Sequence, residues 1–479
     1  MSNASAPLVE QQLKYSGYRK RDVPKHDDEL ASTMPNTPMG EYMRLFWQPV
    51  CLSEELTNLP KAIRIMGEDL VAFRDKRGKV GVLHRHCAHR GASLEYGVIR
   101  EVGISCCYHG WHFDVDGTLL EAPCEQDDTR LKETVSQGAY PAFERDGLVF
   151  AYMGPPEKCP PFPEYDSYSL PEGTKLAAFS NIYPCNWLQV HENIMDHMHT
   201  AVLHNSMVAD GVDAEAEGTS IVGMESLPIM QWQATRSGNG IAFIAGRRLE
   251  NDKVWVRMTE MNLPNYLQIG SLVPSALYVR HSTSSCTRWH VPVDDENSII
   301  FGWRHYNSEV DPEGLGTIED CGVDKIDFIV GQTGNRTYEE GQRAPGDWEA
   351  LTSQRSIAVH ALENPGTSDV GVYMFRKLLR DAVQGKTAPD AKQQEWLASG
   401  ESFALYTQDS VLHAEQQADP AEDRELILEL GKVVMDIMRS ADDVPTAERD
   451  AFVRAKLDEV DGGKGKEAEK NAAHLVARA

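Results

Sequence analysis

The sequence predicts an α+β protein in which a small all-β domain precedes a larger domain with an antiparallel sheet covered by helices. Three observations support this prediction. Short apolar runs separated by turn residues fill residues 46–153, and strand-like runs recur over residues 228–305. Helical periodicity then dominates residues 350–440. A proline-rich stretch, GPPEKCPPFPEYDSYSLP, lies between the two regions and predicts a linker that wraps rather than folds.

We expect four segments along the chain. Residues 1–45 are polar and punctuated by prolines, which predicts an irregular lead-in. Residues 46–153 form the small all-β domain, and residues 154–440 form the larger domain. Residues 441–479 contain a helix that begins near Thr446 and stops at glycine, followed by a tail.

The larger domain mixes one histidine-rich helix, several strands and a helical end. Residues 186–204 predict a single helix rich in histidine and acidic residues. Runs rich in β-branched and aromatic residues predict the strands IMQWQATR, IAFIAGRR, KVWVRMTEM, SALYVRH, CTRWHVPV and SIIFGWRHY. Ser237-Gly238-Asn239-Gly240 predicts a hairpin turn between the first two. The segment RELILELGKVVMDIMRS has the spacing of an amphipathic helix.

Composition excludes several classes of function. The 479 residues carry a formal net charge of −26, which argues against nucleic acid as the main partner. The sequence contains no apolar run of the roughly 18–20 residues that a membrane span needs. The N-terminal segment lacks the plan of a secretory signal, so a cytoplasmic location is expected. Nine cysteines in a chain of this length do not indicate a disulfide framework.

Two short Cys-His fingers form the first candidate metal site. Cys87-Ala88-His89 is followed, after sixteen residues, by Cys106-Cys107-Tyr108-His109. Two thiolates and two imidazoles are the ligands of a Rieske [2Fe–2S] cluster, with the cysteines on one iron and the histidines on the other. A Cys₂His₂ zinc site is the alternative. Zinc fingers of that type usually pair like with like along the chain, so the mixed fingers favour the cluster.

A second candidate metal site lies in the segment D-x₂-H-x₄-H, at Asp196, His199 and His204. On an ideal helix His204 lies about 140° away from His199. Both can bind one metal only if the helix ends or distorts between them. Two histidines and one carboxylate would form the facial triad of a non-haem Fe(II) oxygenase, which leaves positions open for O₂. A polar helix face with hydrogen-bonded histidines is the alternative.

The two fingers also carry a family resemblance. HCAHRGASLEYG and CCYHGWHFDVDG resemble the Rieske domain of ring-hydroxylating oxygenase large subunits. GEYMRLFWQPV and ENPGTSDVGVYMFRKLLRDAV resemble the branch of phthalate dioxygenase and of vanillate or dehydrodivanillate demethylase. The resemblance covers about residues 40–380 and implies Cys87, His89, Cys106 and His109 as cluster ligands. Ala88 stands where the family commonly has proline, which should not affect ligation.

The resemblance also implies roles around the second site. His199, His204 and Asp347 would bind iron, with Asp347 supplied by the segment GDWEALTSQR. Glu349 and Asp369 are weaker candidates for the carboxylate. Asp196 would instead bridge to a Rieske histidine of a neighbouring subunit, while Asn193 would lie beside the ligands without binding the metal.

The implied function is that of a terminal oxygenase. It would use O₂, and electrons from a separate NAD(P)H-dependent reductase of flavin or ferredoxin type, to hydroxylate or oxidatively O-demethylate an aromatic, carboxylated substrate. The sequence has no G-x-G-x-x-G fingerprint in a strand–helix setting, so NAD(P)H must be oxidised elsewhere. Two alternatives are cis-dihydroxylation of the phthalate type and a Rieske electron carrier without oxygenase activity.

The resemblance further implies a trimer or hexamer without a small subunit. A head-to-tail ring would let the Rieske domain of one subunit dock near the iron of the next. A substrate carboxylate would call for an arginine in the pocket. Spacing does not choose among the candidates, which are Arg236, Arg247, Arg248, Arg257 and Arg280.

Overall fold

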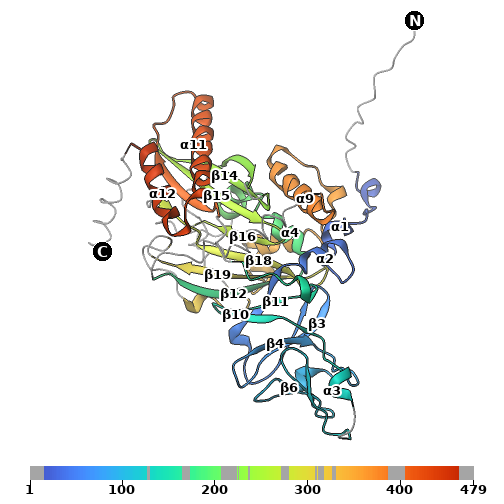
Figure 1. The fold of residues 1–479 in the computed structure, drawn as a ribbon. Helices are drawn as coiled ribbons and strands as arrows, with labels where there is room; N and C mark the ends of the chain where they lie inside the picture. The colour runs from blue at the N-terminus through green and yellow to red at the C-terminus, as the bar shows by residue number, and fades with distance from the viewer. Residues whose placement is uncertain are drawn as a thin grey trace.

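The computed structural model shows two regions joined by a shared core (Figure 1). The residues that it describes are 16–126, 130–163, 173–206, 224, 226–235, 238–270, 280–307, 310, 318–325, 331–386 and 405–462. The small region lies at the lower end of the view, and the larger one, with its long sheet, lies above it. This arrangement confirms the α+β class, with a small all-β region followed by a helix-covered sheet.

Antiparallel strands build the small region. The strands are β1 Trp47–Leu52, β2 Lys61–Ile65, β3 Glu68–Arg74, β4 Val80–His84, β5 Val98–Ile99, β6 Ile104–Ser105, β7 His112–Phe113, β8 Leu119–Glu121, β9 Ala139–Tyr140, β10 Ala142–Arg145 and β11 Leu148–Tyr152. They form sheets in the orders β1-β11-β10, β2-β3-β4-β9 and β5-β6-β7-β8. The two Cys-His fingers follow β4 and β6, so both extend from the sheets farthest from the larger region (Figure 1).

One antiparallel sheet with nine described strands organises the larger region. Its strands are β12 Lys175–Tyr183, β13 Ile229–Ala234, β14 Gly240–Glu250, β15 Lys253–Asn262, β16 Tyr266–Ile269, β17 His281–Ser282, β18 Cys286–Pro292, β19 Ser298–Tyr306 and β20 Gln408–His413. The order is β12-β19-β18-β16-β15-β14-β13, with β20 paired to β15 and β17.

Helices cover both faces of this sheet. They are α4 Trp187–Glu192, α5 His199–Ala201, the π-helical turn η6 Val202–Ser206, α7 Tyr338–Arg343, α8 Asp347–Thr352, α9 Val370–Val383, α11 Pro420–Ser440 and α12 Thr446–Val460. Side chains alternate along β14, because successive strand residues face opposite sides. Phe243 packs in the core that α9 joins, and Ile244 packs in the core of α11 and α12. The site helices α4 and α8 are thus held against a sheet that is buried on both faces.

Most expected strands of the larger region are confirmed. Five of the six predicted runs coincide with β13, β14, β15, β18 and β19. The run SALYVRH and the Ser237–Gly240 turn lie partly outside the described residues. Pro160, in the predicted linker, accepts a hydrogen bond from Nε1 of Trp47 at 2.9 Å, while linker residues 164–171 lie outside the described part of the chain.

Two expectations of secondary structure were wrong. Residues 1–45 contain two short helices, α1 Asp28–Ala31 and α2 Pro38–Met43, where an irregular lead-in was expected. Asp27 and Thr37 cap these helices, and Arg380 of α9 anchors the first through ion pairs. The described part of residues 350–440 is mainly helical, as expected, and also includes the strand β20, which pairs with β15 about 150 residues earlier in the sequence. The predicted single helix 186–204 is broken after Glu192.

The C-terminal helix α12 packs into the same core as α11, through Val453 and Leu457. Arg280, in the segment before β17, pairs with Asp458 of α12. The helix is therefore continuous with the larger region. Among the described residues, none of the helices combines the length and apolar character needed to cross a lipid bilayer.

Candidate active site

The two Cys-His fingers form matching tight loops. The N–H of Gly91 bonds the carbonyl of Cys87 at 2.8 Å, and the N–H of Gly110 bonds the carbonyl of Cys106 at 3.1 Å. Both glycines adopt positive φ, +76° and +72°, a conformation that other residues rarely take. Equivalent loops from two different sheets, after β4 and after β6, bring the expected ligands to the same end of the small region.

The fingers divide into a buried sulfur side and a more exposed imidazole side. Cys87 and Cys106 are buried, and burial with the neighbouring Cys106 thiol raises the pKa of Cys87 to about 11. The rings of His89 and His109 face each other with centroids 4.6 Å apart, and Trp111 stacks on His89 at 4.5 Å. Cys107 is exposed and separate from the buried thiols. The donor set suits a Rieske cluster, whose cysteines bind one iron and whose histidines bind the other.

Gln137 holds the first finger in place. Its amide donates to the carbonyls of His84 and His86 at 2.7 and 2.9 Å, and its Oε1 accepts from the N–H of Ala88 at 2.7 Å. The side chain is 3% exposed. Sequence analysis missed this residue, because nothing in its local pattern marks a side chain that bonds a loop some fifty residues away.

We predict that Gln137→Met destabilises the cluster domain without removing a ligand. Three buried hydrogen bonds are lost, at roughly 1 kcal/mol each, for a total of about 3 kcal/mol. Loss of the cluster's visible absorbance on heating should then occur at a lower temperature than in the wild type. Gln126→Met, on an exposed glutamine of the same domain, is the control. Equal melting of the three proteins would contradict the assigned role.

Side chains bond backbone carbonyls just after the break in the predicted helix, at the second metal site. Nδ1 of His199 bonds the carbonyl of Asp196, and Oγ1 of Thr200 donates to the carbonyl of His197 at 2.8 Å. In a continuous helix these carbonyls would accept from backbone N–H groups one turn later, so the side chains compete with the helix. The chain then resumes as α5 and the π-helical η6.

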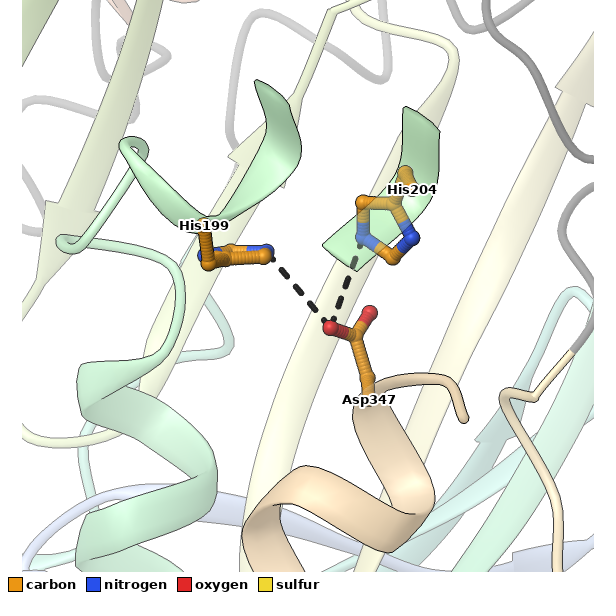
Figure 2. A group of neighbouring side chains, drawn as sticks. All are labelled: His199, His204 and Asp347. Carbon is orange, nitrogen blue, oxygen red and sulfur yellow. Dashed lines mark ion pairs between the residues drawn. The ribbon is translucent and has the colours of Figure 1, made fainter. Parts of the chain in front are cut away.

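The π-helical turn brings the side chains of His199 and His204 to the same side of the chain. In an α-helix these residues point about 140° apart, whereas the wider π turn returns residues five apart to one side. Figure 2 shows both imidazoles facing the carboxylate of Asp347, which comes from the first residue of α8. The spacing predicted that the helix must end or distort between the two histidines if both bind one metal, and the structure shows such a distortion.

Three donor atoms converge at this point. Nε2 of His199 and Nε2 of His204 each lie 3.5 Å from Oδ1 of Asp347, and all three ligand atoms lie within 4.8 Å of one another. Ligands that bind a metal at about 2.1 Å are about 3–3.5 Å apart, so the spacing fits one ion. Oδ1 of Asp347 is buried and has no hydrogen-bond partner within the described parts of the chain. An ion at this point would satisfy the atom.

Electrostatics favour an ionised Asp347. Burial alone would raise the pKa of this carboxyl group, but the imidazoles of His204 and His199 and the amide of Gln332 hold it well below its usual range. A deprotonated carboxylate is the form that binds metal. Glu349 instead bonds the N–H of Gly346 and pairs with Arg336, and Asp369 bonds the N–H of Gly366. The structure therefore places Asp347 beside the two histidines, whereas the two weaker candidates, Glu349 and Asp369, bond other groups.

Gln332 fixes the orientation of the carboxylate. Its Nε2 donates to Oδ2 of Asp347 at 2.6 Å, which leaves Oδ1 aimed at the imidazoles. Its own carbonyl accepts from Nδ2 of Asn181 and from the hydroxyl of Tyr183, each at 3.1 Å. This buried residue, from a turn before α7, was also missed by the sequence analysis.

We predict that Gln332→Met lowers affinity for the mononuclear iron by about 10–100-fold, the usual effect of losing a group that orients a metal ligand. Equilibrium dialysis of the apoprotein against Fe(II) measures the change. Gln354→Met, on an exposed glutamine just after α8, is the matched control. Unchanged iron affinity in Gln332→Met would show that Asp347 is oriented by something else.

A cavity of about 60 Å³ adjoins the three donors. Its described lining includes His199, His204 and Asp347, the apolar residues Ile194, Met224, Phe243 and Ile269, and the polar residues Asn193, His197, Thr200, Arg257, Thr259, Arg288 and Gln332. The predicted neighbour Asn193 thus borders the site, as does one of the five candidate arginines, Arg257. Arg288 borders the cavity too and was not among the candidates.

The candidate arginines are largely engaged within the protein. Nε of Arg257 lies 2.9 Å from Oδ1 of Asp409, and both side chains are buried. Arg248 pairs with Asp423, and Arg280 pairs with Asp458. Arg247 bonds polar groups behind the cavity wall, while Arg236 lies outside the described residues.

Asp196 lies half-buried beside the donor set. Its carbonyl orients His199, whereas the group of three converging donors consists of His199, His204 and Asp347 and does not include its carboxylate. Burial raises the pKa of Asp196, against the opposing effect of His199. The residue therefore contacts the site through its backbone carbonyl, while its carboxylate accepts a hydrogen bond from the backbone N–H of Met198.

Comparison with known proteins decides the family. Residues 46–139 match the Rieske [2Fe-2S] domain, and residues 151–317 match the family described as LigXa C-terminal domain like. The oxygenase subunit of tert-butanol monooxygenase / tert-amyl alcohol desaturase from Aquincola tertiaricarbonis is 57% identical over 93% of this chain and 96% of its own. The chain is a Rieske oxygenase α subunit. It is therefore an enzyme, and the predicted family is confirmed.

Other relatives place this Rieske oxygenase in the expected branch. The 5,5'-dehydrodivanillate O-demethylase oxygenase subunit of Sphingobium sp. is 31% identical over 77% of this chain and 82% of its own. Phenoxybenzoate dioxygenase subunit alpha of Ectopseudomonas oleovorans is 37% identical over 79% and 89%. The fold is similar to that of dicamba monooxygenase bound to 3,6 dichlorosalicylic acid, with a TM-score of 0.51, 16% identity, and coverage of 73% and 99%.

The family determines the cofactors of this Rieske oxygenase. It uses a Rieske [2Fe–2S] cluster and a mononuclear non-haem iron, as expected. Both donor sets fit these groups in number, chemistry and burial. The alternatives of a zinc module and of an electron carrier without oxygenase activity are not supported.

Proposed function

We propose that this Rieske oxygenase is the terminal component of a system that hydroxylates a small tertiary alcohol with O₂. The observation that supports this choice is the 57% identity, over 96% of the relative's length, to the oxygenase subunit of tert-butanol monooxygenase / tert-amyl alcohol desaturase. Relatives named for aromatic substrates are 31–37% identical. The aromatic substrate expected from the sequence therefore becomes the second candidate.

The cavity agrees with a small uncharged substrate. Ile194, Phe243 and Ile269 give it apolar walls. The charge of Arg257 is offset by Asp409, which also accepts a hydrogen bond from Nε1 of Trp255 at 2.8 Å. A buried guanidinium already paired in this way offers little net charge to a substrate carboxylate.

A second candidate is an aromatic carboxylate, which would be O-demethylated, monohydroxylated or cis-dihydroxylated. Arg288 favours it, because this guanidinium also borders the cavity and guanidinium groups bind carboxylates. The relative named as a phenoxybenzoate dioxygenase points the same way.

We assign the ligands as the sequence predicted. Cys87, His89, Cys106 and His109 would bind the cluster, and His199, His204 and Asp347 would bind the mononuclear iron. When bound, this iron supplies activation of O₂ beside the substrate. Gln332 orients the carboxylate and the carbonyl of Asp196 orients His199. Asn193 borders the reaction space without a ligand role.

Electrons would enter from a separate NAD(P)H-dependent reductase and cross between subunits. The cluster fingers lie at the lower end of the molecule, whereas α4 lies well above, beyond the sheets of the small region (Figure 1). We therefore propose a head-to-tail trimer, or a hexamer of two trimers, in which the Asp196 carboxylate bridges to His89 or His109 of the neighbour. A cytoplasmic location, with no nucleic-acid or membrane partner, remains the expectation from charge and hydropathy.

Product analysis tests the function. The enzyme with both metals, supplied with NADH and a generic reductase, is offered tert-butanol, tert-amyl alcohol, phenoxybenzoate and phthalate in parallel. We expect a diol from tert-butanol at a rate well above that for either aromatic acid. Turnover of the aromatic acids alone would replace the proposal with the second candidate.

A further inference from the structure

We propose that His197 binds the substrate by donating a hydrogen bond from Nδ1 to a substrate oxygen, and that Arg247 fixes the ring in the tautomer that can do so. The inference rests on the proposed function, in which the oxygen is the hydroxyl of a tertiary alcohol. It assigns a specificity-determining residue that neither the metal site nor the comparisons identify.

His197 lies between the broken helix and the cavity. It is 7% exposed and borders the same cavity as His199 and His204. Its ring packs against Phe243 with centroids 4.9 Å apart and planes tilted by 31°. The phenyl group supports one face of the imidazole, which limits the directions in which the two ring nitrogens can point.

Arg247 determines which nitrogen carries the proton. Its Nη1 lies 3.3 Å from Nε2 of His197. A guanidinium only donates hydrogen bonds, so Nε2 must accept and must carry no proton. The single proton of the neutral imidazole is therefore on Nδ1.

The arginine that fixes this tautomer is itself rigidly held. Arg247 is 1% exposed and donates from Nε to the carbonyl of Ser226 at 3.1 Å. Its Nη2 donates to Oγ1 of Thr200 at 2.9 Å, and that hydroxyl donates to the carbonyl of His197 at 2.8 Å. His197, Arg247 and Thr200 thus form a closed loop of hydrogen bonds behind the cavity wall.

Nδ1 is left available to a ligand. Within the described ranges, the contacts of the His197 side chain are those to Arg247 and Phe243, and neither engages Nδ1. Nδ1 is not one of the fully buried polar atoms without a partner, and His197 lines the cavity, so this atom is placed to meet a ligand there. A neutral N–H donor that faces an apolar cavity is suited to an uncharged oxygen acceptor. Asn193 and Thr259 border the same space and can accept the proton of an alcohol.

The hydrogen bond to His197 would orient the substrate within the cavity. An alcohol whose oxygen binds His197 places its alkyl groups among the remaining cavity residues, which include the iron-site histidines. A compound without an acceptor oxygen loses this contact and leaves the buried donor unpaired, which lowers affinity. The same donor would bind an ether or carboxylate oxygen of an aromatic substrate.

Two amide variants separate the two nitrogens. In His197→Gln the amide reaches the former position of Nε2, so it keeps an acceptor for Arg247 but removes the cavity donor. In His197→Asn the amide occupies the former position of Nδ1 and keeps a donor towards the cavity. We expect the His197→Gln substitution to raise both KM and the calorimetric Kd for tert-butanol about tenfold, with a smaller change in kcat. For His197→Asn, KM and Kd for tert-butanol should stay within about threefold of the wild-type values.

Isobutane, which has the same carbon skeleton without the hydroxyl, is the matched probe. We expect wild type and both variants to handle it alike, because it cannot accept the hydrogen bond. The iron content and the visible spectrum of the cluster must match the wild type in each variant. A His197→Gln variant with both metals that binds tert-butanol as tightly as the wild type would overturn the inference.

Failure of the proposed function is distinguishable from failure of this inference. If the wild type oxidises no alcohol, the proposed substrate class is wrong, and the two variants are assayed with phenoxybenzoate. If His197→Gln then binds phenoxybenzoate more weakly and His197→Asn binds it almost normally, His197 still donates a hydrogen bond, but to an oxygen of the aromatic acid. Equal binding in all three proteins would remove that role as well.

Discussion

Asp347→Asn should lose the mononuclear iron while keeping the Rieske cluster. The wild type is expected to contain about three iron atoms and about two acid-labile sulfides per chain, and the variant about two of each. The substitution keeps the volume of the side chain but removes the negative charge from the oxygen that lies 3.5 Å from both imidazoles. Product formation should fall by more than about 100-fold. Metal and sulfide analysis, with product analysis on the same sample, measures both effects.

Glu339→Gln provides the control for this loss of charge. Glu339 is an exposed carboxylate on α7 that pairs with Arg343, away from the three donors. It should retain the metal content and activity of the wild type. Retention of the full iron complement in Asp347→Asn would contradict the ligand assignment and reopen the question of the third ligand.

Asp196→Asn should keep both metals but slow electron transfer between them by about 10–100-fold. The carbonyl that bonds His199 belongs to the backbone and is unchanged, so iron binding persists. The lost charge belongs to the carboxylate, which we propose accepts a hydrogen bond from a cluster histidine of the neighbouring subunit. Carboxylates that hydrogen-bond to imidazoles orient the rings, and their loss commonly costs about 10–100-fold in activity. Stopped-flow absorbance of the reduced enzyme mixed with O₂ and substrate follows cluster oxidation directly.

Asp369→Asn removes a nearby charge without touching the proposed bridge. Asp369 interacts electrostatically with Asp196 and bonds the N–H of Gly366 at the start of α9. We expect normal cluster oxidation in this control. Cluster oxidation in Asp196→Asn at the wild-type rate, with both metals present, would show that electrons take another route.

Features defined by short spacing could be predicted from the sequence. The Cys-His fingers, the pair His199 and His204, and most strands of the large sheet depend on residues within a few positions of one another. The distortion between the two histidines was also predictable as a condition, because five residues on an α-helix cannot serve one ion. Its form, a π-helical turn over Val202–Ser206, was not predictable from the spacing.

Features that depend on distant contacts could not be predicted in this way. Gln332 orients Asp347 only because Asn181 and Tyr183 of β12, about 150 residues earlier, hold its carbonyl. Gln137 and the strand β20 have the same long-range character. The ion pair between Arg257 and Asp409 could not be predicted from composition either. This pair weakens the case for a carboxylated substrate.

The metal sites therefore follow from the sequence more closely than the substrate does. Ligand types and spacing define the chemistry at iron, whereas the cavity is assembled from β14, β15, β18 and the segment after α4. Phe243, Arg257 and Arg288 come from different strands, so no local pattern identifies the compound that they surround. Identity to the tertiary-alcohol oxygenase and the uncharged donor on His197 now give that question a specific answer to test.

A single turnover under ¹⁸O₂ tests the central claim most directly. The enzyme, with cluster and iron reduced in advance and the reductant removed, is mixed with tert-butanol and ¹⁸O₂ in the absence of reductase. The account predicts that the cluster becomes oxidised as a diol forms, and that the new hydroxyl of the diol carries ¹⁸O. Oxidation of the cluster without diol, or a diol whose new oxygen comes from water, would contradict it.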